Sequence, residues 1–235
     1  MDIYDTYIRN VMDFPIKGIN FRDITPLLSN GDVFHQVITD LNKELPSFDK
    51  YDKIIAAESR GFIFAGALAS MNNKGLVLAR KAGKLPIVGY RETYKLEYGT
   101  ATIEIPKDAI QPGDKVVVMD DLIATGGSAK AMVDLVIQAG GIPILALFVI
   151  ELRSLEGYKN LGIPTKSIVS YGLHKDDLLQ VSTHSHLVKF VSKINDTTLK
   201  VVTRDGKEEE VEKSQIISVV EIGENGRLIY IRYRD

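Results

Sequence analysis

The stretch Val116-Val117-Val118-Met119-Asp120-Asp121-Leu122-Ile123-Ala124-Thr125-Gly126-Gly127-Ser128 combines three features in order. An apolar run predicts a buried strand, two aspartates end it, and a Thr-Gly-Gly-Ser turn begins the next helix. In open α/β sheets, ligands bind just beyond the carboxyl ends of the strands, at turns of this kind. The stretch therefore predicts an α/β fold with a binding site at this turn.

The residues of the turn have the chemistry of a sugar phosphate site. Backbone N–H groups of a glycine-rich turn point at an anion, and the dipole of the following helix favours that anion. Thr125 and Ser128 add hydroxyl donors, while Asp120 and Asp121 can accept hydrogen bonds from two vicinal hydroxyls. The arrangement suits a ribose 5-phosphate; the alternative is an aspartate-capped strand-to-helix turn that binds nothing.

Further apolar runs lie on both sides of this stretch, at residues 53–57, 76–79 and 144–150, with helical segments between them. Unbroken apolar strands separated by helices are typical of a parallel sheet that is covered on both faces. Residues 100–105 alternate polar and apolar side chains, which predicts an antiparallel excursion with one face in water. At the start of the chain, residues 3–12 have helical spacing and residues 14–23 look irregular.

The pattern changes after about residue 182, where five short runs with strand-like composition replace the helical spacing. Turn signals such as Asp205-Gly206 separate them. We therefore expect a domain over 1–182 and a small β-rich C-terminal extension over 183–235. The expected strands are 187–191, 199–203, 209–211, 216–222 and 228–233.

Composition excludes several classes of protein. The 29 basic and 31 acidic residues leave a net charge of −2, which argues against a nucleic-acid-binding protein. The absence of cysteine excludes a disulfide scaffold, a thiolate nucleophile and a cysteine-ligated metal. No signal peptide is visible, and no apolar run approaches the ~20 residues that span a bilayer. We expect a cytoplasmic protein with neither a membrane nor a nucleic-acid partner.

Cations are concentrated after two of the predicted strands. Arg80, Lys81 and Lys84 lie within five residues, and Arg60 follows the strand at 53–57. Such a set can bind a pyrophosphate leaving group, on which negative charge grows in the transition state; the alternative is a solvated basic turn. His184-Ser185-His186 has no third ligand in view, so we expect no metal site formed by the protein itself.

The stretch 116–128 resembles the phosphoribosyl pyrophosphate (PRPP) motif of type I phosphoribosyltransferases, and in form that of their adenine-specific members. The resemblance extends in matching order over about 14–171, and residues beyond about 182 are not part of the usual short enzyme. It implies a parallel sheet with flanking helices and an antiparallel hood at about 82–106. The other matching segments are the base-binding loop 14–26, the pyrophosphate loop 58–61, the basic loop 80–86 and the hood segment 94–99.

The resemblance implies the purine salvage reaction in which adenine and PRPP give AMP and pyrophosphate. Glu97 would be the catalytic acid and base at the purine N7, with Tyr94 and Tyr98 of the hood closing over the ribose. The implied binding residues are Asp120 and Asp121 for the ribose; Ala124, Thr125, Gly126, Gly127 and Ser128 for the 5-phosphate; Ser59, Arg60, Arg80, Lys81 and Lys84 for pyrophosphate; and Asn20, Phe21 and Arg22 for adenine.

The same resemblance implies Mg²⁺ that arrives bound to PRPP, a homodimer, and a cis peptide bond between Glu58 and Ser59. Taken without the resemblance, Glu97 is typical of a surface carboxylate and Phe21 is as consistent with a core aromatic. Tyr94 and Tyr98 are equally consistent with packing within the hairpin.

Two alternative functions remain open at this point. One is transfer to another purine such as xanthine, but Ala124 stands where the 6-oxopurine enzymes usually carry an aspartate. Asn20 departs from the aliphatic residue that often precedes the aromatic one. The other is a PRPP-binding, purine-responsive regulator without catalysis. Regulators of that kind tend to lose the hood acid and gain a basic module, whereas this chain keeps Glu97, and its residues 187–235 hold nine basic and nine acidic side chains.

Overall fold

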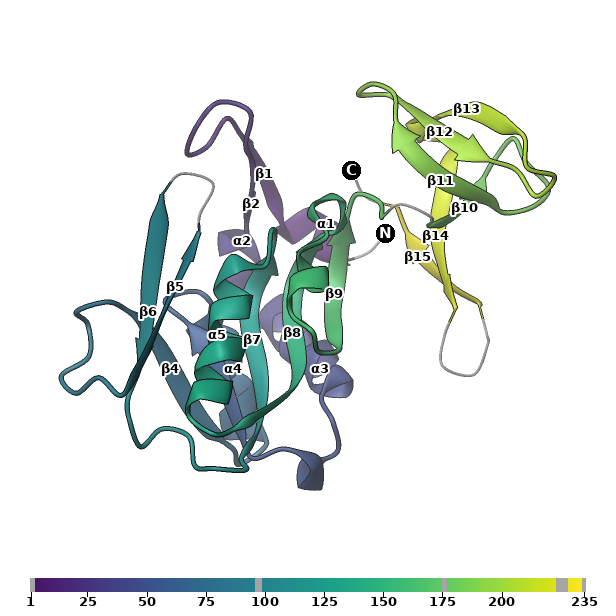
Figure 1. Cartoon of the computed structure of the whole chain (residues 1–235). Coiled ribbons are helices and arrows are strands. Elements are labelled where there is room, and N and C mark those ends of the chain that lie inside the picture. Colours follow the sequence, from purple (N-terminus) through teal and green to yellow (C-terminus); the bar gives the residue numbers. More distant parts are fainter. Residues whose placement is uncertain (1–2, 96–98, 175–176, 223–227, 234–235) are drawn as a thin grey trace. The chain divides into compact units, whose positions relative to one another are not determined.

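The computed structural model describes residues 3–95, 99–174, 177–222 and 228–233 (Figure 1). The chain divides into two compact units. The first contains Met1–Ile150 and Tyr158–Val169, and the second contains Glu151–Gly157 and Ser170–Asp235. The division expected at residue 182 stays a prediction; in the structure, β10 (Leu178–Val181) already lies in the sheet of the second unit.

The first unit is built on what we call the core sheet, whose strands among the described residues run in the order β5-β6-β4-β3-β7-β8-β9. β3 pairs in parallel with both β4 and β7, while β6 pairs antiparallel with β4 and β5. The predicted α/β sheet with an antiparallel hood is therefore confirmed. Its strands are β3 (Lys53–Ala57), β4 (Gly75–Lys81), β5 (Tyr90–Lys95), β6 (Thr100–Ile105), β7 (Lys115–Ile123), β8 (Ile142–Leu152) and β9 (Thr165–Tyr171).

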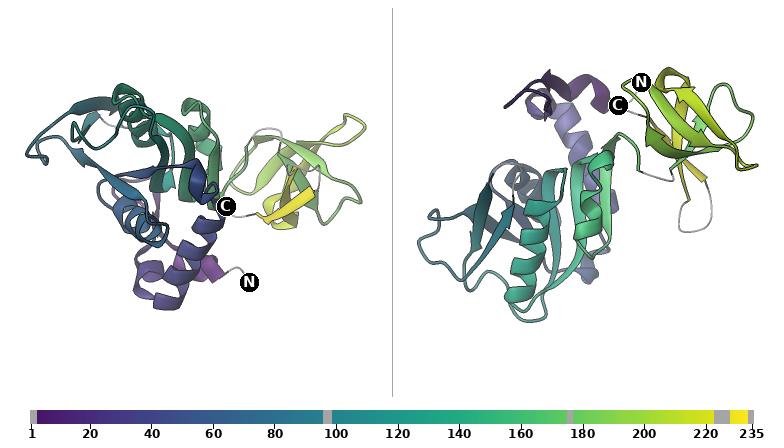
Figure 2. Two further views of the ribbon diagram at one scale, coloured as in Figure 1. Left: turned by 90° about the horizontal axis from the view of Figure 1, so that it is seen from below. Right: turned by 45° about the horizontal axis from the view of Figure 1, so that its top comes forward.

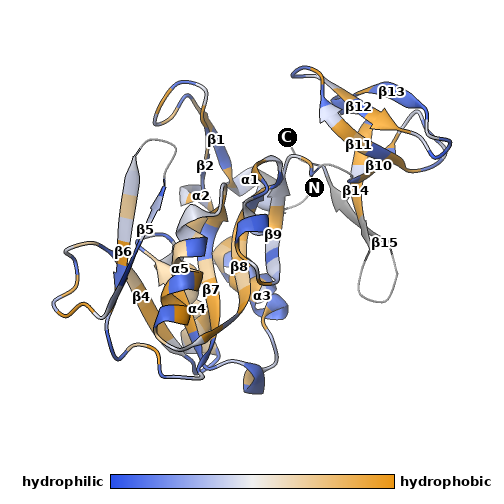
Figure 3. Cartoon of the chain, in the orientation of Figure 1, coloured by the Kyte–Doolittle hydropathy of each residue, from blue (hydrophilic) through white to orange (hydrophobic). Residues whose placement is uncertain are grey.

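Helices cover both faces of the core sheet. α5 (Gly127–Gln138) lies on one face, and α3 (Gly31–Glu44) and α4 (Gly61–Met71) lie on the other (Figures 1 and 2). Apolar residues fill the sheet and α4, as the colours of Figure 3 show. No helix in the described part of the chain is long and apolar enough to cross a membrane.

The N-terminal segment differs from the expected helix over 3–12. The helix α1 (Ile3–Tyr7) stops early, and β1 (Arg9–Met12) pairs antiparallel with β2 (Asn20–Asp23) before the short helix α2 (Thr25–Ser29). The expectation was wrong there because a four-residue strand is decided by its pairing partner, which helical spacing does not reveal.

The prediction of one wet face along β6 was wrong for its second half. Ile103, Glu104 and Ile105 are all buried in succession. β4 and β5 pair with β6 on its two sides, and the chain that follows β4 turns back over this end of the strand: the N–H of Ala82 donates to the carbonyl of Thr102 at 3.0 Å.

The second unit contains one further sheet, whose strands in the described residues run in the order β13-β12-β11-β10-β14-β15. All five predicted runs contain strands, and β10 is an additional one. β10 pairs with both β11 and β14. The chain runs from β10 through β11, β12 and β13, and β14 then returns to pair with the other side of β10. The other strands of this sheet are β11 (Val188–Lys193), β12 (Thr198–Val202), β13 (Glu208–Glu212), β14 (Ile216–Ile222) and β15 (Leu228–Arg232). In the described residues of the two units, short 3-10 helices occur at Phe48–Lys50, Arg153–Leu155, Gly157–Asn160 and Lys213–Gln215.

Candidate active site

The two aspartates of the quoted stretch lie in β7, where only 8% of Asp120 and 6% of Asp121 is exposed. The Oδ1 of Asp120 accepts a hydrogen bond from the Asp121 N–H at 3.0 Å. A Cβ on Gly61, the first residue of α4, would come within 2.6 Å of that same oxygen. Glycine at this position therefore allows the start of α4 to pack directly against the carboxylate.

Burial makes this acidic pair electrostatically unusual. Desolvation and the neighbouring Asp121 charge raise the pKa of Asp120 well above its ordinary value. Desolvation also raises the pKa of Asp121, opposed by the guanidinium of Arg60, whose Nε lies 3.0 Å from the Asp121 Oδ2. The pair is thus a site where added hydrogen-bond donors stabilise the charged carboxylates.

The glycine-rich turn lines a pocket of about 270 Å³ beside the aspartates. Gly126 precedes α5 with a φ of 82°, a left-handed conformation that glycine adopts without strain. Residues 122–129 line the pocket together with Tyr94 and Lys95, so all five predicted 5-phosphate residues meet there. The Nδ2 of Asn160 donates to the Thr125 carbonyl at 3.1 Å and holds the turn from outside.

The end of hood strand β5 packs directly on this turn. A Cβ on Gly127 would lie 3.0 Å from the Lys95 carbonyl oxygen and 3.2 Å from Cδ2 of Tyr94. Burial and the charge of Asp120 raise the pKa of Tyr94. Tyr94 therefore joins the turn to the acidic pair, whereas Glu97 and Tyr98 lie outside the described residues.

Arg60 connects the acidic pair to the predicted base-binding segment. Its guanidinium carbon lies 5.1 Å from the centre of the Phe21 ring, and the Phe14 ring meets Phe21 edge-on at 5.2 Å between centres. The Arg22 side chain donates a hydrogen bond to the side chain of Asn10. The side-chain oxygen of Asn20 is buried with no hydrogen-bond partner among the described residues.

The predicted basic loop begins at an ion pair that sequence reasoning missed. The Oε2 of Glu58 accepts from Arg80 Nε at 2.9 Å and from the Lys81 N–H at 3.1 Å, and these contacts lower the pKa of Glu58. The peptide bond between Glu58 and Ser59 is cis, which confirms that expectation. Of the predicted pyrophosphate residues, the structure brings Arg80 to Glu58. It leaves Ser59, Lys81 and Lys84 exposed to water.

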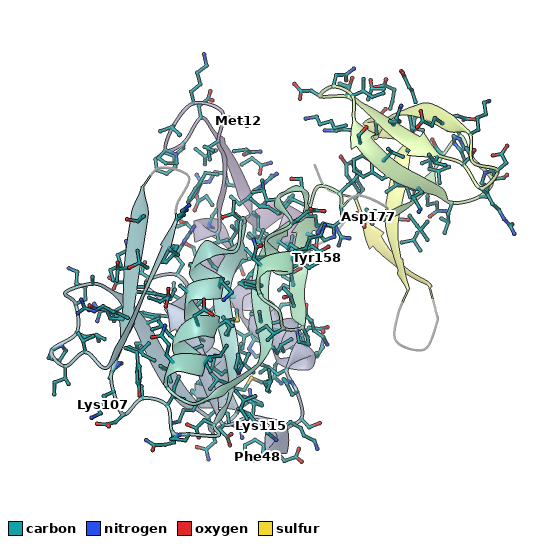
Figure 4. All side chains as sticks on the ribbon, in the orientation of Figure 1. Met12, Phe48, Lys107, Lys115, Tyr158 and Asp177 are labelled. Atoms are coloured by element: carbon teal, nitrogen blue, oxygen red, sulfur yellow. The ribbon has the colours of Figure 1, made fainter. Side chains whose placement is uncertain are left out.

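Figure 4 labels a residue at each end of the first unit, Lys115 where β7 begins and Met12 in the β1–β2 hairpin. Lys115, the first residue of β7, is at the end opposite to Met12 of the β1–β2 hairpin, so β7 runs toward that hairpin. The carboxyl end of β7 and the base-binding segment therefore share an end of the unit, as expected for an open α/β sheet. Glu58 belongs to the predicted pyrophosphate loop 58–61, but no pattern in the sequence indicates its pairing with Arg80, 22 residues further along the chain.

Comparisons with known proteins identify the family of this chain. No family model matches the chain. An adenine phosphoribosyltransferase of Rubrobacter xylanophilus is 49% identical over 166 residues, which are 70% of this chain and 89% of that protein. The chain belongs to the adenine phosphoribosyltransferase family. This confirms the family, the transferase class and the reaction expected from the sequence, and neither alternative function is favoured.

Solved structures from the family agree with the fold of the first unit. The enzyme of Thermoanaerobacter pseudethanolicus is similar with a TM-score of 0.69 and 44% identity, over 71% of this chain and 97% of that one. The enzyme of Saccharomyces cerevisiae, solved with an imino-altritol bisphosphate and adenine, gives 0.65 and 39%, over 69% and 94%. This chain is longer than these family members, which leaves the extension without a counterpart in them.

Proposed function

We propose that the chain transfers the 5-phosphoribosyl group of PRPP to N9 of adenine at the carboxyl end of β7. The bond between C1′ and the pyrophosphate oxygen breaks and the bond between C1′ and N9 forms. Adenine reacts as its N7–H tautomer, and Glu97 accepts the one proton that the base loses, at N7. The observation that carries the proposal is the 270 Å³ pocket lined by residues 122–129, which directly follow the buried Asp120–Asp121 pair in the chain. Arg60 lies 3.0 Å from Asp121. A phosphate cup beside a diol acceptor fits the ribose 5-phosphate half of PRPP.

The ribose half is held by the acidic pair and the turn. Asp120 and Asp121 accept hydrogen bonds from the two ring hydroxyls, which supply the donors that buried carboxylates need. Residues 124–128 surround the 5-phosphate with backbone N–H groups and with the hydroxyls of Thr125 and Ser128, at the positive end of the α5 dipole. Tyr94 closes this half from the hood side.

Cationic side chains bind the pyrophosphate half of PRPP and stabilise it as it leaves. Arg60, Arg80, Lys81 and Lys84 supply the positive charge, and Ser59 adds a hydroxyl. These groups stabilise the leaving group most strongly in the transition state, when the oxygen that departs from C1′ gains charge. The exposure of the two lysines supports this role, because an exposed amine can turn toward an arriving anion.

Mg²⁺ fits this site as an ion that enters bound to PRPP, and not as one that the protein binds by itself. Within the described residues, no group of three or more histidine, aspartate or glutamate side chains is arranged to hold a metal. Mg²⁺ keeps several waters and binds phosphate oxygens readily, so PRPP itself supplies its ligands. When bound, the ion neutralises charge on the pyrophosphate.

The base is held by Phe21 and by the hood. Phe21 stacks on the adenine ring, and the backbone near Asn20 and Arg22 reads N1 and the 6-amino group. Ala124 leaves no carboxylate opposite N7, so Glu97, which follows β5 in the hood, takes the proton there as the bond to N9 forms.

We also propose a cytoplasmic homodimer. Exposed apolar side chains of the first unit support the dimer. They are Ile63 and Met71 of α4, and Ile87, which follows the basic loop. A second copy of the chain would bury them. The absence of cysteine is compatible with a reducing compartment.

The deciding experiment offers adenine, hypoxanthine, guanine and xanthine separately, each with PRPP and Mg²⁺. We expect consumption of adenine alone, with one pyrophosphate released for each AMP formed. Turnover of a 6-oxopurine at a comparable rate would reassign the base specificity. Tight PRPP binding with no turnover of any base would instead identify a regulator.

A further inference from the structure

A row of alternating charges crosses the hood side of the core sheet. Glu104 of β6 pairs in register with Arg80 of β4 on one side and with Arg91 of β5 on the other. Directly opposed residues of adjacent strands project from the same face of a sheet. Arg80 in turn binds Glu58, so the four side chains form what we call the charge ladder: Glu58, Arg80, Glu104, Arg91.

Glu104 is the most buried member of the charge ladder, with 2% of the residue exposed. Its Oε1 lies 3.2 Å from an Nη of Arg91, and most of that arginine is in water. An ion pair with one partner in water contributes little net stability, and burial of the carboxylate costs desolvation free energy. Ile103 and Ile105, which flank Glu104 in β6, project from the opposite face of the strand, whereas Glu104 shares its face with Arg80 and Arg91. Stability therefore gives no reason for a carboxylate here.

The second contact of Glu104 supplies a reason. Its Oε2 accepts a hydrogen bond from the N–H of Gly83 at 3.1 Å. Gly83 is in the middle of the basic loop 80–86, between Lys81 and Lys84, and has a φ of 80°. Glu58 holds the start of the same loop through the Lys81 N–H. Two carboxylates thus bind backbone N–H groups of this loop, one at its start and one at its tip.

The position of Glu104 also links the loop to the hood. Glu104 belongs to β6, which pairs antiparallel with β5 in the hood. This pair of strands and the basic loop are therefore joined by a hydrogen bond from the loop tip to a buried side chain. Because Lys81 and Lys84 flank that tip, its orientation determines where their ammonium groups can reach.

We propose that Glu104 is a positioning residue, which fixes the tip of the basic loop so that Lys81 and Lys84 face the pyrophosphate end of PRPP. This inference rests on the proposed role of the loop in binding pyrophosphate. Glu104 acts through Gly83 and does not itself touch the substrate. Its loss therefore weakens contacts to pyrophosphate and leaves the ribose 5-phosphate half of the site intact.

The test measures two ligands by calorimetry: inorganic pyrophosphate with Mg²⁺, and ribose 5-phosphate. Glu104→Leu removes the acceptor while keeping an apolar residue that suits the buried strand. We expect its pyrophosphate affinity to fall about tenfold, the scale of one charge-assisted hydrogen bond, with ribose 5-phosphate affinity unchanged within about twofold. Glu104→Gln keeps an acceptor for the Gly83 N–H and should recover most of the pyrophosphate affinity.

Two further variants separate the possible failures. Glu44→Leu is the control, because Glu44 of α3 forms an ion pair with Lys166 of β9 at 3.0 Å and belongs to an element apart from the loop. Lys84→Ala tests the loop itself. Unchanged pyrophosphate binding in Lys84→Ala would remove the loop from the proposed function. Loss in Lys84→Ala with normal binding in Glu104→Leu, or equal loss of both ligands in Glu104→Leu, would overturn the inference about Glu104 alone.

Discussion

At the scale of single residues, Asp121 is held between a buried carboxylate and a cation. Arg60 stands 3.0 Å from it and also contacts the Phe21 ring, so one guanidinium joins the proposed ribose and base halves of the site. Any change of charge at Asp121 therefore affects both halves, and the size of each effect can be measured separately.

Asp121→Asn should weaken PRPP binding about tenfold, because a neutral amide replaces a charged acceptor of a hydroxyl proton. The variant keeps the shape of the side chain and should keep the fold. Titration calorimetry with PRPP measures the change, and thermal unfolding serves as the control for folding. An unchanged PRPP affinity would contradict the ribose assignment.

Asp120 gives a prediction about pH. Its folded-state pKa is raised above the ordinary value of 3.8, so between these two pKa values the folded chain holds a proton that the unfolded chain has released. The contribution of this group to the free energy of unfolding therefore falls as pH rises from 3.8 through the raised pKa. Asp120→Asn removes that loss, so its free energy of unfolding should exceed that of the wild type by more at pH 7.5 than at pH 4.

Urea unfolding of the wild type and of Asp120→Asn at both pH values tests this sign without ligand. A difference that shrinks or reverses as pH rises would show that the carboxylate is better accommodated in its charged form than its burial indicates. The variant should at the same time bind PRPP less tightly, since stability and function make opposite demands on a buried acid.

Glu97→Gln should lower the chemical step by roughly 10²–10⁴-fold, the usual loss for a general acid or base. PRPP affinity should stay close to that of the wild type, because the residue acts at the base and not at the ribose. Single-turnover kinetics with saturating PRPP measures the step. Turnover close to that of the wild type would remove Glu97 from the mechanism.

At the scale of elements, the contact between β5 and the glycine-rich turn decides how the hood meets the phosphate pocket. A side chain at Gly127 has no room beside the Lys95 carbonyl and Tyr94. Gly127→Val should therefore displace β5 from the turn and reduce PRPP affinity by about tenfold or more. Gly31→Val is the matched control, because a Cβ at Gly31, the first residue of α3, meets no atom within 4 Å. Equal PRPP affinities in the two variants would contradict this account of the contact.

The same scale shows what the sequence could predict. β7, the turn and α5 were predicted correctly because an unbroken apolar run and two glycines are local signals. The pairing of β1 with β2, the position of β10 in the second sheet and the ion pair of Glu58 with Arg80 all join residues distant in the chain. Spacing within a segment carries no information about such partners, so these features escaped prediction.

At the scale of the whole molecule, every described residue of the candidate site belongs to the first unit, and the second unit has its own core around Leu179, Val201 and Val219. A chain ending after Asp177 should therefore keep its kcat and KM within about threefold. This cut removes β10–β15 but retains the ion pair of Arg153 Nη2 with Asp177 Oδ1, at 2.8 Å and nearly buried.

A second chain ending after Ser170 is the comparison, because it also removes Asp177 from buried Arg153 and should unfold at a lower temperature. Activity assays and sedimentation of both chains measure the outcome. A folded, dimeric product of the first cut that makes no AMP would place the extension in the active site.

The double pairing of β10 has a consequence for biosynthesis. β10 requires β14 as well as β11, and β14 is translated only after three intervening strands. By then the last strand of the core sheet has already left the ribosome, since β9 precedes β10 in the chain. The transferase can thus fold on the nascent chain before its extension can close its own sheet. Such an order lets a gene acquire, exchange or lose the extension by fusion at one point, without altering how the catalytic part reaches its native state.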